Sequence, residues 1–216
     1  MTTLLSDNFE TKLGTIQTWV ESEKNIEQYQ QDKFKVATIG HEICLVPFDL
    51  KQIWFPETME YESAKGWRWF IEKTNNEKEK LTIFCKLINP STDTEFDSSS
   101  GEHLDAIEIE NRTYHLHIGT EDGERLKYRA EQNEWMPKRF KGDIGFHKSF
   151  TEYVDFGFKT IIPTMDNGEK IYFHFIVATN SIEASKDYPY ERNISTWFAV
   201  DKSKRWLDEK LEKYGR

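Results

Sequence analysis

Hydrophobic and polar residues alternate along most of the chain, in short runs separated by clusters of Gly, Asn, Asp and Pro. This alternation is typical of strands in antiparallel sheets that bury one face. The pattern predicts about ten strands, which fall at Phe34–Ile39, Glu42–Phe48, Trp67–Glu72, Lys80–Ile88, Leu104–Glu110, Thr113–Thr120, Glu124–Ala130, Glu152–Ile162, Glu169–Thr179 and Ile194–Val200. The predicted fold class is mainly β, either an antiparallel β-sandwich or a partly closed β-barrel.

Both ends of the chain show a helical period. Near the N-terminus, Asp7 and Glu10 fit a capping box, and apolar residues recur at helical spacing at Phe9, Leu13, Ile16 and Val20. Gly14 and the run 15–20 also leave a strand possible there. Near the C-terminus, the segment Ser203–Tyr214 places Trp206, Leu207, Leu211 and Tyr214 on one face. We therefore expect an N-terminal and a C-terminal helix, each packed against the sheet.

Composition indicates one folded domain. Of the 216 residues, 37% are hydrophobic and 14% aromatic, which is enough to fill a core, so a single domain is expected over residues 1–216. The one conspicuous polar segment, 89–103, is rich in Asn, Ser, Asp and Gly. It is predicted to be a flexible loop.

Charge and sorting signals restrict the partners. The 38 acidic and 29 basic residues give a net charge of -9, which disfavours nucleic acid and anionic membranes as partners. The start of the chain, Met1–Asp7, lacks the basic region and apolar stretch of a signal peptide. Cys44 and Cys85 lie in apolar runs without CxxC spacing, as buried thiols do. We expect a cytoplasmic protein.

One motif suggests metal chemistry. His115, His117 and Glu121 follow the spacing His-x-His-x-x-x-Glu. This spacing resembles the first metal-binding motif of the cupin barrels, a resemblance that implies a further histidine from a later strand, for which His147 is the candidate. The chain departs from that family, because Gly142–His147 lacks the expected proline and the interval after Glu121 is short. The family is not assigned on these seven residues.

Strand register gives an independent prediction for the histidine pair. A three-residue loop at Glu121–Gly123 would bring Leu126 and Tyr128 to the same side as Leu116 and Ile118. His115 and His117 would then lie on the opposite, charged face, beside Arg125, Lys127 and Arg129. Because three cations oppose a divalent ion, we expect no metal and no cofactor there, but a solvated face able to bind a polar ligand or partner.

Aromatic residues supply a second candidate surface. Trp54 and the run Trp67–Phe70 flank a polar connection, and Trp67 and Trp69 share one strand face, opposite Arg68 and Phe70. Core packing explains such residues, and a platform for a saccharide or a protein partner is the alternative, since Trp and Arg are enriched at binding hot spots.

The function predicted from the sequence is a non-catalytic recognition or regulatory module that binds a protein or a small polar ligand. The chain contains no GxxxxGK[ST], GxGxxG or GxSxG motif, although catalytic residues that meet only in the fold need no motif. The predicted binding residues are Trp54, Trp67, Arg68, Trp69, His115, His117 and Arg129. A metal-dependent enzyme in a barrel cavity and an acidic inhibitor of a basic partner are the alternatives.

Overall fold

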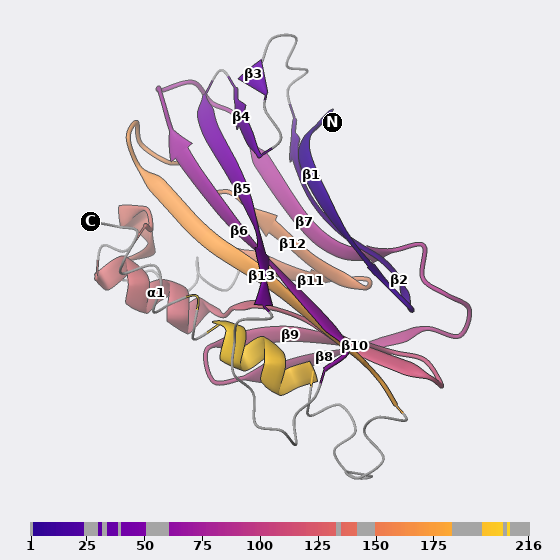
Figure 1. Cartoon of the computed structure of the whole chain (residues 1–216). Helices are drawn as coiled ribbons and strands as arrows, with labels where there is room; N and C mark the ends of the chain where they lie inside the picture. The colour runs from indigo at the N-terminus through magenta and orange to yellow at the C-terminus, as the bar shows by residue number, and fades with distance from the viewer. Residues whose placement is uncertain are drawn as a thin grey trace.

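The fold was examined in a computed structural model of the chain, which describes residues 2–23, 30–31, 34–38, 40–50, 61–132, 135–141, 150–182, 196–204 and 207. It is mainly β and contains two antiparallel sheets (Figure 1). Within the described ranges neither sheet closes into a barrel. None of the described helices is long and apolar enough to cross a membrane.

The smaller sheet has five strands. Their order in space is β1 (Thr2–Thr11), β2 (Gly14–Ser22), β7 (Leu81–Ile88), β12 (Gly157–Ile161) and β11 (Thr151–Val154). β1 and β2 form an N-terminal hairpin, and β11 and β12 form a second hairpin at the other edge. The edge strand β11 supplies side chains to the site described below.

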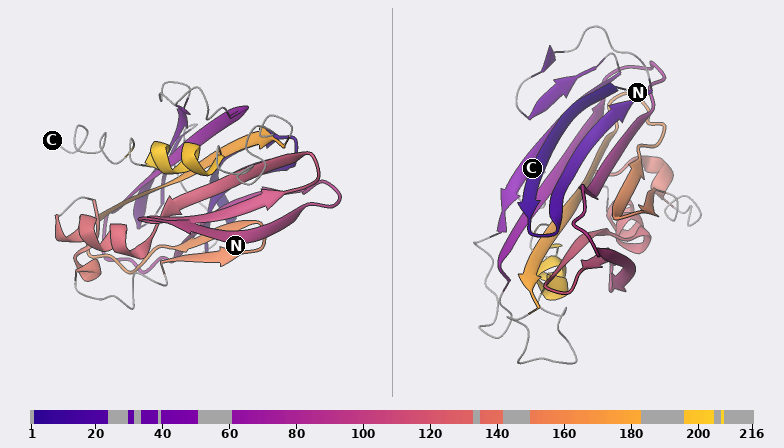
Figure 2. Two further views of the ribbon diagram at one scale, coloured as in Figure 1. Left: turned by 90° about the horizontal axis from the view of Figure 1, so that it is seen from below. Right: turned by 90° about the vertical axis from the view of Figure 1, so that its right-hand side faces the viewer.

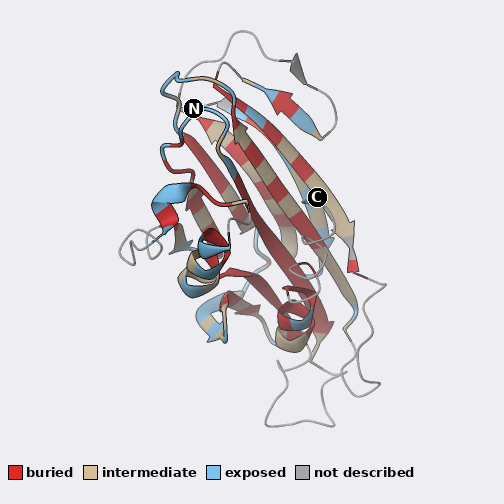
Figure 3. Cartoon of the chain, turned by 90° about the vertical axis from the view of Figure 1, so that its left-hand side faces the viewer, coloured by how far each residue is buried: buried red, intermediate tan, exposed pale blue. Residues whose placement is uncertain are grey.

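The larger sheet has eight strands. Their order is β3 (Gln30–Gln31), β4 (Lys35–Ala37), β5 (His41–Asp49), β6 (Ser63–Lys73), β13 (Lys170–Ser181), β10 (Tyr114–Glu121), β9 (Leu104–Glu110) and β8 (Glu95–Gly101). After β10 the chain continues into the helix α1 (Gly123–Glu131), and a short 3-10 helix η2 (Lys138–Phe140) follows. Nearly every residue of β10 and β13 is buried, which indicates that both faces of the sheet are covered there; buried residues are red in Figure 3.

One hydrophobic cluster contains residues of both sheets. Ile16, Val20 and Cys85 of the smaller sheet share it with Leu116 and Ile118 of β10. Alternate residues of each strand face this core, as the period-two pattern of the sequence predicts. Burial of this apolar area is the largest favourable contribution to folding.

A second hydrophobic cluster covers the opposite face of the larger sheet. The helical segment 196–204, yellow in Figures 1 and 2, lies over this face. Its Ala199 and Val200 pack with Leu104, Ile176 and Ala178 of the sheet. The larger sheet is therefore buried on both faces around β10 and β13.

The predicted N-terminal helix is wrong. Residues 2–22 form the hairpin of β1 and β2, the outcome that Gly14 had left open. Gly14 has φ of +141°, which an L side chain rarely adopts, and it follows directly on the turn between the strands. In β2 the buried residues are Ile16, Thr18, Val20 and Ser22, so the period that decides this segment is two.

The predicted strands at Glu124–Ala130 and Ile194–Val200 are also wrong. α1 occupies the first range, and residues 196–200 are helical. Asp122 caps α1 by accepting a hydrogen bond from the Arg125 amide, 2.8 Å away. Leu126, Arg129 and Ala130 are the buried residues of α1, at helical spacing. The predicted C-terminal helix is helical at 203, 204 and 207, and the rest of its range lies outside the described residues.

Most of the other predicted strands match the structure to within a few residues, and β5, β7, β9, β10 and β13 occupy their predicted ranges. The single strand predicted at Glu152–Ile162 is wrong, because residues 155 and 156 form the turn of a hairpin between β11 and β12. Residues 95–101, which belong to the predicted loop 89–103, form the edge strand β8 and pair with β9. The sequence of β8 shows no alternation of hydrophobic and polar residues, because most of this strand is exposed and three of its residues are serines.

Candidate functional site

The two histidines of the HxH motif lie beneath the helical segment 196–204. His115 and His117 are on the face of β10 opposite Leu116, and both are buried. The Oγ1 atom of Thr196 lies 2.8 Å from Nδ1 of His117 and 3.1 Å from Nδ1 of His115. Burial, together with the charge of His115, lowers the pKa of His117 to about 3, so this imidazole is neutral at physiological pH.

The predicted solvated face around the histidine pair is therefore wrong. The prediction required a strand after Glu121, and α1 stands there instead. Alternation correctly separated the histidines from Leu116 and Ile118, but it could not reveal that a distant helical segment covers their side.

The residues of the cupin-like motif do not converge in the described part of the chain. His115 and His117 bond to Thr196, whereas Glu121 bonds to Arg129. Within that part, no group of three possible metal ligands includes these residues. His147 lies outside the described residues.

The residues of the predicted aromatic surface on β6 lie on two different faces of the sheet. Trp67 and Trp69 are fully buried, and their indole N–H groups donate to Asp7, at 2.7 Å, and to Thr18, at 3.1 Å. Arg68 points to the other face, where its guanidinium lies 5.2 Å from the ring centre of Phe48. The predicted exposed platform is therefore wrong for Trp67 and Trp69, and Trp54 lies outside the described residues.

Arg129, predicted to lie on a binding face, belongs to a buried polar network. Its guanidinium donates to both carboxylate oxygens of Glu121, at 2.8 and 3.0 Å, and to the backbone carbonyl of Tyr172. The Oε2 atom of Glu121 lies 3.5 Å from Nδ1 of His174, which also contacts the Tyr172 hydroxyl at 3.1 Å. We call these residues, Glu121, Arg129, Tyr172 and His174, the buried network.

Charge balance within the buried network sets its pKa values. Burial raises the pKa of Glu121, but the charges of Arg129 and His174 and the hydrogen bonds from Arg129 outweigh it and hold that pKa below its ordinary value. Burial lowers the pKa of His174 to about 4, although Glu121 opposes the shift. The network is thus a compensated carboxylate and guanidinium pair beside a neutral imidazole.

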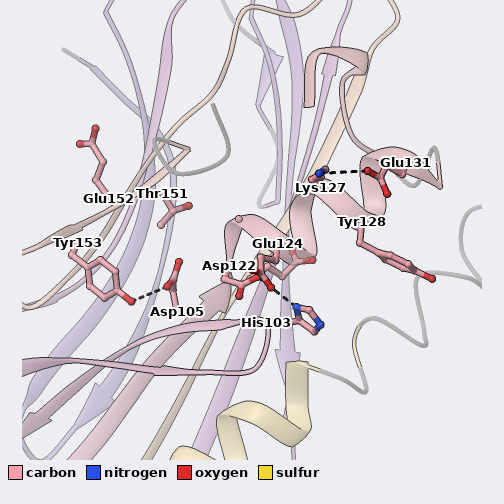
Figure 4. Close-up of a pocket in the computed structure, with 12 residues that line it drawn as sticks. His103, Asp105, Asp122, Glu124, Lys127, Tyr128, Glu131, Thr151, Glu152 and Tyr153 are labelled. Carbon is pink, nitrogen blue, oxygen red and sulfur yellow. Dashed lines mark hydrogen bonds and ion pairs between the residues drawn. The ribbon is translucent and has the colours of Figure 1, made fainter. Parts of the chain in front are cut away.

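A pocket of about 990 Å³ opens at the edge where β9, α1 and β11 meet (Figure 4). Its volume is at the upper end of the range for small-ligand sites. Six acidic residues line it, at Asp105, Glu121, Asp122, Glu124, Glu131 and Glu152. Lys127 and His103 are the basic side chains of its lining. The pocket is therefore strongly acidic.

Two tyrosines add aromatic surface to this pocket. Tyr128 of α1 is 50% exposed and Tyr153 of β11 is 43% exposed, the highest values among the described large hydrophobic residues together with Phe96. In Figure 4 they stand on opposite sides of the carboxylates of Asp105, Asp122 and Glu124. The ring of Tyr128 already has a cation beside it, because the guanidinium of Arg125 lies 5.1 Å from its centre. The exposed ring of Tyr153, next to the carboxylate of Asp105, is a surface suited to a further cation.

The acidic residues of the pocket differ in how their charge is compensated. Glu121 bonds to Arg129, Glu131 lies 3.9 Å from Lys127, and Glu152 accepts a hydrogen bond from Lys159 at 2.9 Å. Asp105, in contrast, accepts a hydrogen bond from the Tyr153 hydroxyl at 2.9 Å. Among the described residues, no basic side chain pairs with Asp105 or Glu124.

The carboxylate of Asp105 and the phenol of Tyr153 shift each other's pKa values. Burial and the nearby carboxylate of Asp122 raise the pKa of Asp105, against the hydrogen bond from Tyr153. Burial and the charge of Asp105 raise the pKa of Tyr153, so its phenol stays protonated and donates. The uncompensated charge of the pocket is concentrated at this half-buried carboxylate.

One group in the pocket has the composition of a metal site. His103, Asp122 and Glu124 each offer one ligand atom, and these atoms lie within 4.8 Å of one another. Asp122 already caps α1, and its Oδ1 atom lies 3.9 Å from Nδ1 of His103. The local geometry of the group is therefore explained by helix capping.

The residues of this pocket were not predicted as a site, although their sequence carried a signal. Asp122-Gly123-Glu124 is a capping sequence that the strand interpretation of Glu124–Ala130 concealed. Asp105 and Tyr153 come from separate sheets and are 48 residues apart, so nothing local connects them.

Comparison with known proteins found no family model that matches the chain and no curated protein that matches its sequence.

Proposed function

We propose that the chain is a single-domain β-sandwich module, without catalytic activity, that binds a small polar ligand bearing a positive charge in the pocket between β9, α1 and β11. The observation that carries the proposal is the lining of that pocket, in which exposed Tyr128 and Tyr153 flank carboxylates that outnumber the basic side chains. A cation gains from the carboxylates by charge and from the ring of Tyr153 by the cation–π interaction, whereas the ring of Tyr128 is already next to the guanidinium of Arg125.

The non-catalytic assignment is supported by the position of three imidazoles outside the pocket lining. His115, His117 and His174 are buried, and their described contacts are with Thr196, Tyr172 and Glu121, whereas His103 lines the pocket. The acidic lining also repels phosphate, in keeping with the expectation that nucleic acid and anionic membranes are not partners. Cys44 and Cys85 are present as thiols, which fits the expected cytoplasmic location.

Thermal stability in the presence of ligands tests the proposal. Small amines and guanidines should raise the Tm of the protein, because a ligand that binds the folded state at about 100 times its Kd adds about 2.7 kcal/mol. Neutral and anionic compounds of similar size should leave Tm unchanged. Elemental analysis of protein purified without chelator belongs to the same experiment, since a stoichiometric metal would favour the enzyme alternative.

A matched pair of charge reversals localises the binding. Glu124→Lys places a cation in the pocket and should abolish the Tm increase caused by amines. Glu42→Lys makes the same change at an exposed position of β5, outside the pocket lining, and should preserve it. Equal loss in both variants, or stabilisation by anions as well as cations, would contradict the proposal.

A further inference from the structure

The pocket contains one feature that specifies the kind of cation. Asp105 lies on β9 directly opposite Thr120 of β10, on the side of the sheet that faces the smaller sheet. Tyr153 reaches it from the edge strand of that smaller sheet, and its hydroxyl donates to Oδ1 of Asp105. One oxygen of this carboxylate is thus held by a phenol, and Figure 4 shows Asp105 between Tyr153 on one side and Asp122 and Glu124 on the other.

A metal ion is a poor occupant of this position. The described group with metal-ligand geometry consists of His103, Asp122 and Glu124 and does not include Asp105. A phenol that stays protonated and donates a hydrogen bond offers little to a metal ion. Tyr153 and Asp105 therefore form a hydrogen-bonding unit.

An ammonium group that carries hydrogens matches the same position better. Such a group has donors for the carboxylate of Asp105 and for the neighbouring carboxylates of Asp122 and Glu124, which a quaternary ammonium lacks. Hydrogen bonds between two charged groups are about twice as strong as neutral ones. The aliphatic carbons next to the nitrogen can contact the exposed rings of Tyr153 and Tyr128.

We propose that the pocket binds an organic ligand through a primary ammonium group, and that Asp105 is the residue that anchors this group and selects it over metal ions and quaternary amines. This inference rests on the proposed function, because it names the chemical class of the cation that the pocket takes. The ammonium group can belong to a free amine or to a lysine side chain of a partner.

Binding should also be linked to a proton. The charged and titratable groups around Asp105 are Tyr153 from β11, Asp122 before α1, and the other lining groups His103, Glu124 and Lys127. Because burial and Asp122 raise the pKa of Asp105, a cation at this carboxylate lowers that pKa again and releases a proton. Affinity for the amine should therefore fall as the pH is lowered.

NMR titration of the full chain tests the anchor with three probes: putrescine, its fully N-methylated counterpart and Mn²⁺. Putrescine should shift the amides of residues around Asp105 and bind at least tenfold more weakly to Asp105→Asn, which keeps the oxygen that accepts from Tyr153. The methylated counterpart should bind more weakly than putrescine. Its affinity should be similar for the unchanged protein and for Asp105→Asn. Glu42→Gln removes an exposed carboxylate of β5 and serves as the control.

A second measurement does not depend on a variant of Asp105. Calorimetry of putrescine binding in two buffers of different ionisation enthalpy should report proton release at acidic pH, where the carboxylate of Asp105 begins to be protonated. It is performed on His103→Asn, which removes the histidine of the pocket lining and is tolerated at this left-handed position, where φ is +61°. Absence of proton release would overturn the linkage even if Asp105→Asn fails to fold.

The outcomes separate the two proposals. Putrescine binding that Asp105→Asn changes by less than twofold overturns the anchor but leaves the cation pocket in place. Equal affinities for putrescine and its methylated counterpart would also overturn the anchor and leave the cation pocket in place, because hydrogen bonds from the ammonium group would then not contribute to selection. Mn²⁺ broadening at His103, Asp122 and Glu124 without putrescine binding overturns the anchor and favours a metal site. Binding of no cation overturns both proposals.

Discussion

Asp105 and Glu121 are two carboxylates on neighbouring strands, one residue pair apart in the ladder of β9 and β10, yet their surroundings are opposite. Glu121 lies on the outer face of the sheet, in a bidentate ion pair with Arg129 that has no exposed side-chain surface. Asp105 lies at the open end between the sheets, next to a phenol and another carboxylate.

The difference shows how a protein separates stability from recognition. The charge of Glu121 is compensated by Arg129, so this carboxylate is not available to a ligand. Removal of Arg129 would leave a buried, uncompensated charge and destabilise the protein. The charge of Asp105 is uncompensated and accessible from a pocket, so it costs stability in the free protein and can be neutralised by a ligand. The following changes test this contrast, from the largest expected effect to the smallest.

Removing the partner of Glu121 should have the largest effect. Arg129→Met leaves a buried carboxylate without a cation and should lower the free energy of unfolding by about 3–5 kcal/mol. Urea denaturation measures the change. The double variant Glu121→Gln with Arg129→Met removes both charges and should recover part of the loss. A cost below about 1 kcal/mol for the single variant would mean that the pair is not buried as described.

Acid should destabilise the protein through its buried histidines. Burial holds the folded pKa of His117 at about 3 and that of His174 at about 4, below the ordinary value of 6.5. The unfolded chain therefore binds more protons than the folded one between these limits, so stability is full above pH 6.5 and is lost as the pH falls. At pH 5 the loss is on the order of 2 kcal/mol per histidine.

Urea midpoints at pH 7.5 and 5.0 measure this dependence. His117→Asn should make it shallower, because one of the two imidazoles with a lowered pKa no longer titrates. His103→Asn, at a side chain that is 42% exposed, is the matched control and should leave the dependence as it is. An identical slope in all three proteins would show that the buried histidines do not govern the acid response.

Packing of the helical segment 196–204 on the sheet is tested at Gly119. A Cβ added there would lie 2.2 Å from Cγ1 of Val200, so Gly119→Ala should cost about 1–3 kcal/mol. Gly66→Ala on β6, where the nearest atom is 3.7 Å away, is the control and should cost less. Val200→Ala should relieve the clash in the double variant. If both alanine variants lower the free energy of unfolding by the same amount, Val200 does not pack against Gly119 as closely as described.

The smallest effect on stability is expected at Asp105. Since its pKa is raised, its charge opposes folding at neutral pH, and Asp105→Asn should change the free energy of unfolding by less than about 1 kcal/mol, in the stabilising direction. Urea denaturation at pH 7 measures it beside Arg129→Met. A loss comparable to that of Arg129→Met would make Asp105 a structural residue and remove the contrast with Glu121.

Much of the fold was predictable because strands impose a local pattern. The alternation in β5, β9, β10 and β13 gave their ranges, and the mainly β class followed from them. The errors fell where a segment satisfied two local patterns at once. Residues 7–20 match a helical period as well as a period of two, and the second turned out to be decisive because Thr18 and Ser22 are buried with Ile16 and Val20.

The candidate site was much less predictable. Of the residues predicted to bind a ligand, Trp67, Trp69, His115, His117 and Arg129 are buried. The sequence indicated that these side chains could bind a ligand, but it did not indicate that they are buried. Burial depends on segments that are distant in the chain: Thr196, which contacts His115, is 81 residues from it. The pocket itself joins Asp105 of one sheet to Tyr153 of the other.

The sequence by itself determined the β class, the ranges of β5, β9 and β10, and the separation of His115 and His117 from the apolar side of β10, since alternation depends on nearest neighbours along the chain. Only the tertiary structure decided which side of that strand is covered, which carboxylate receives a cation and which remains open. Those outcomes depend on contacts between residues far apart in sequence, and a solvated and a covered polar face have the same local pattern.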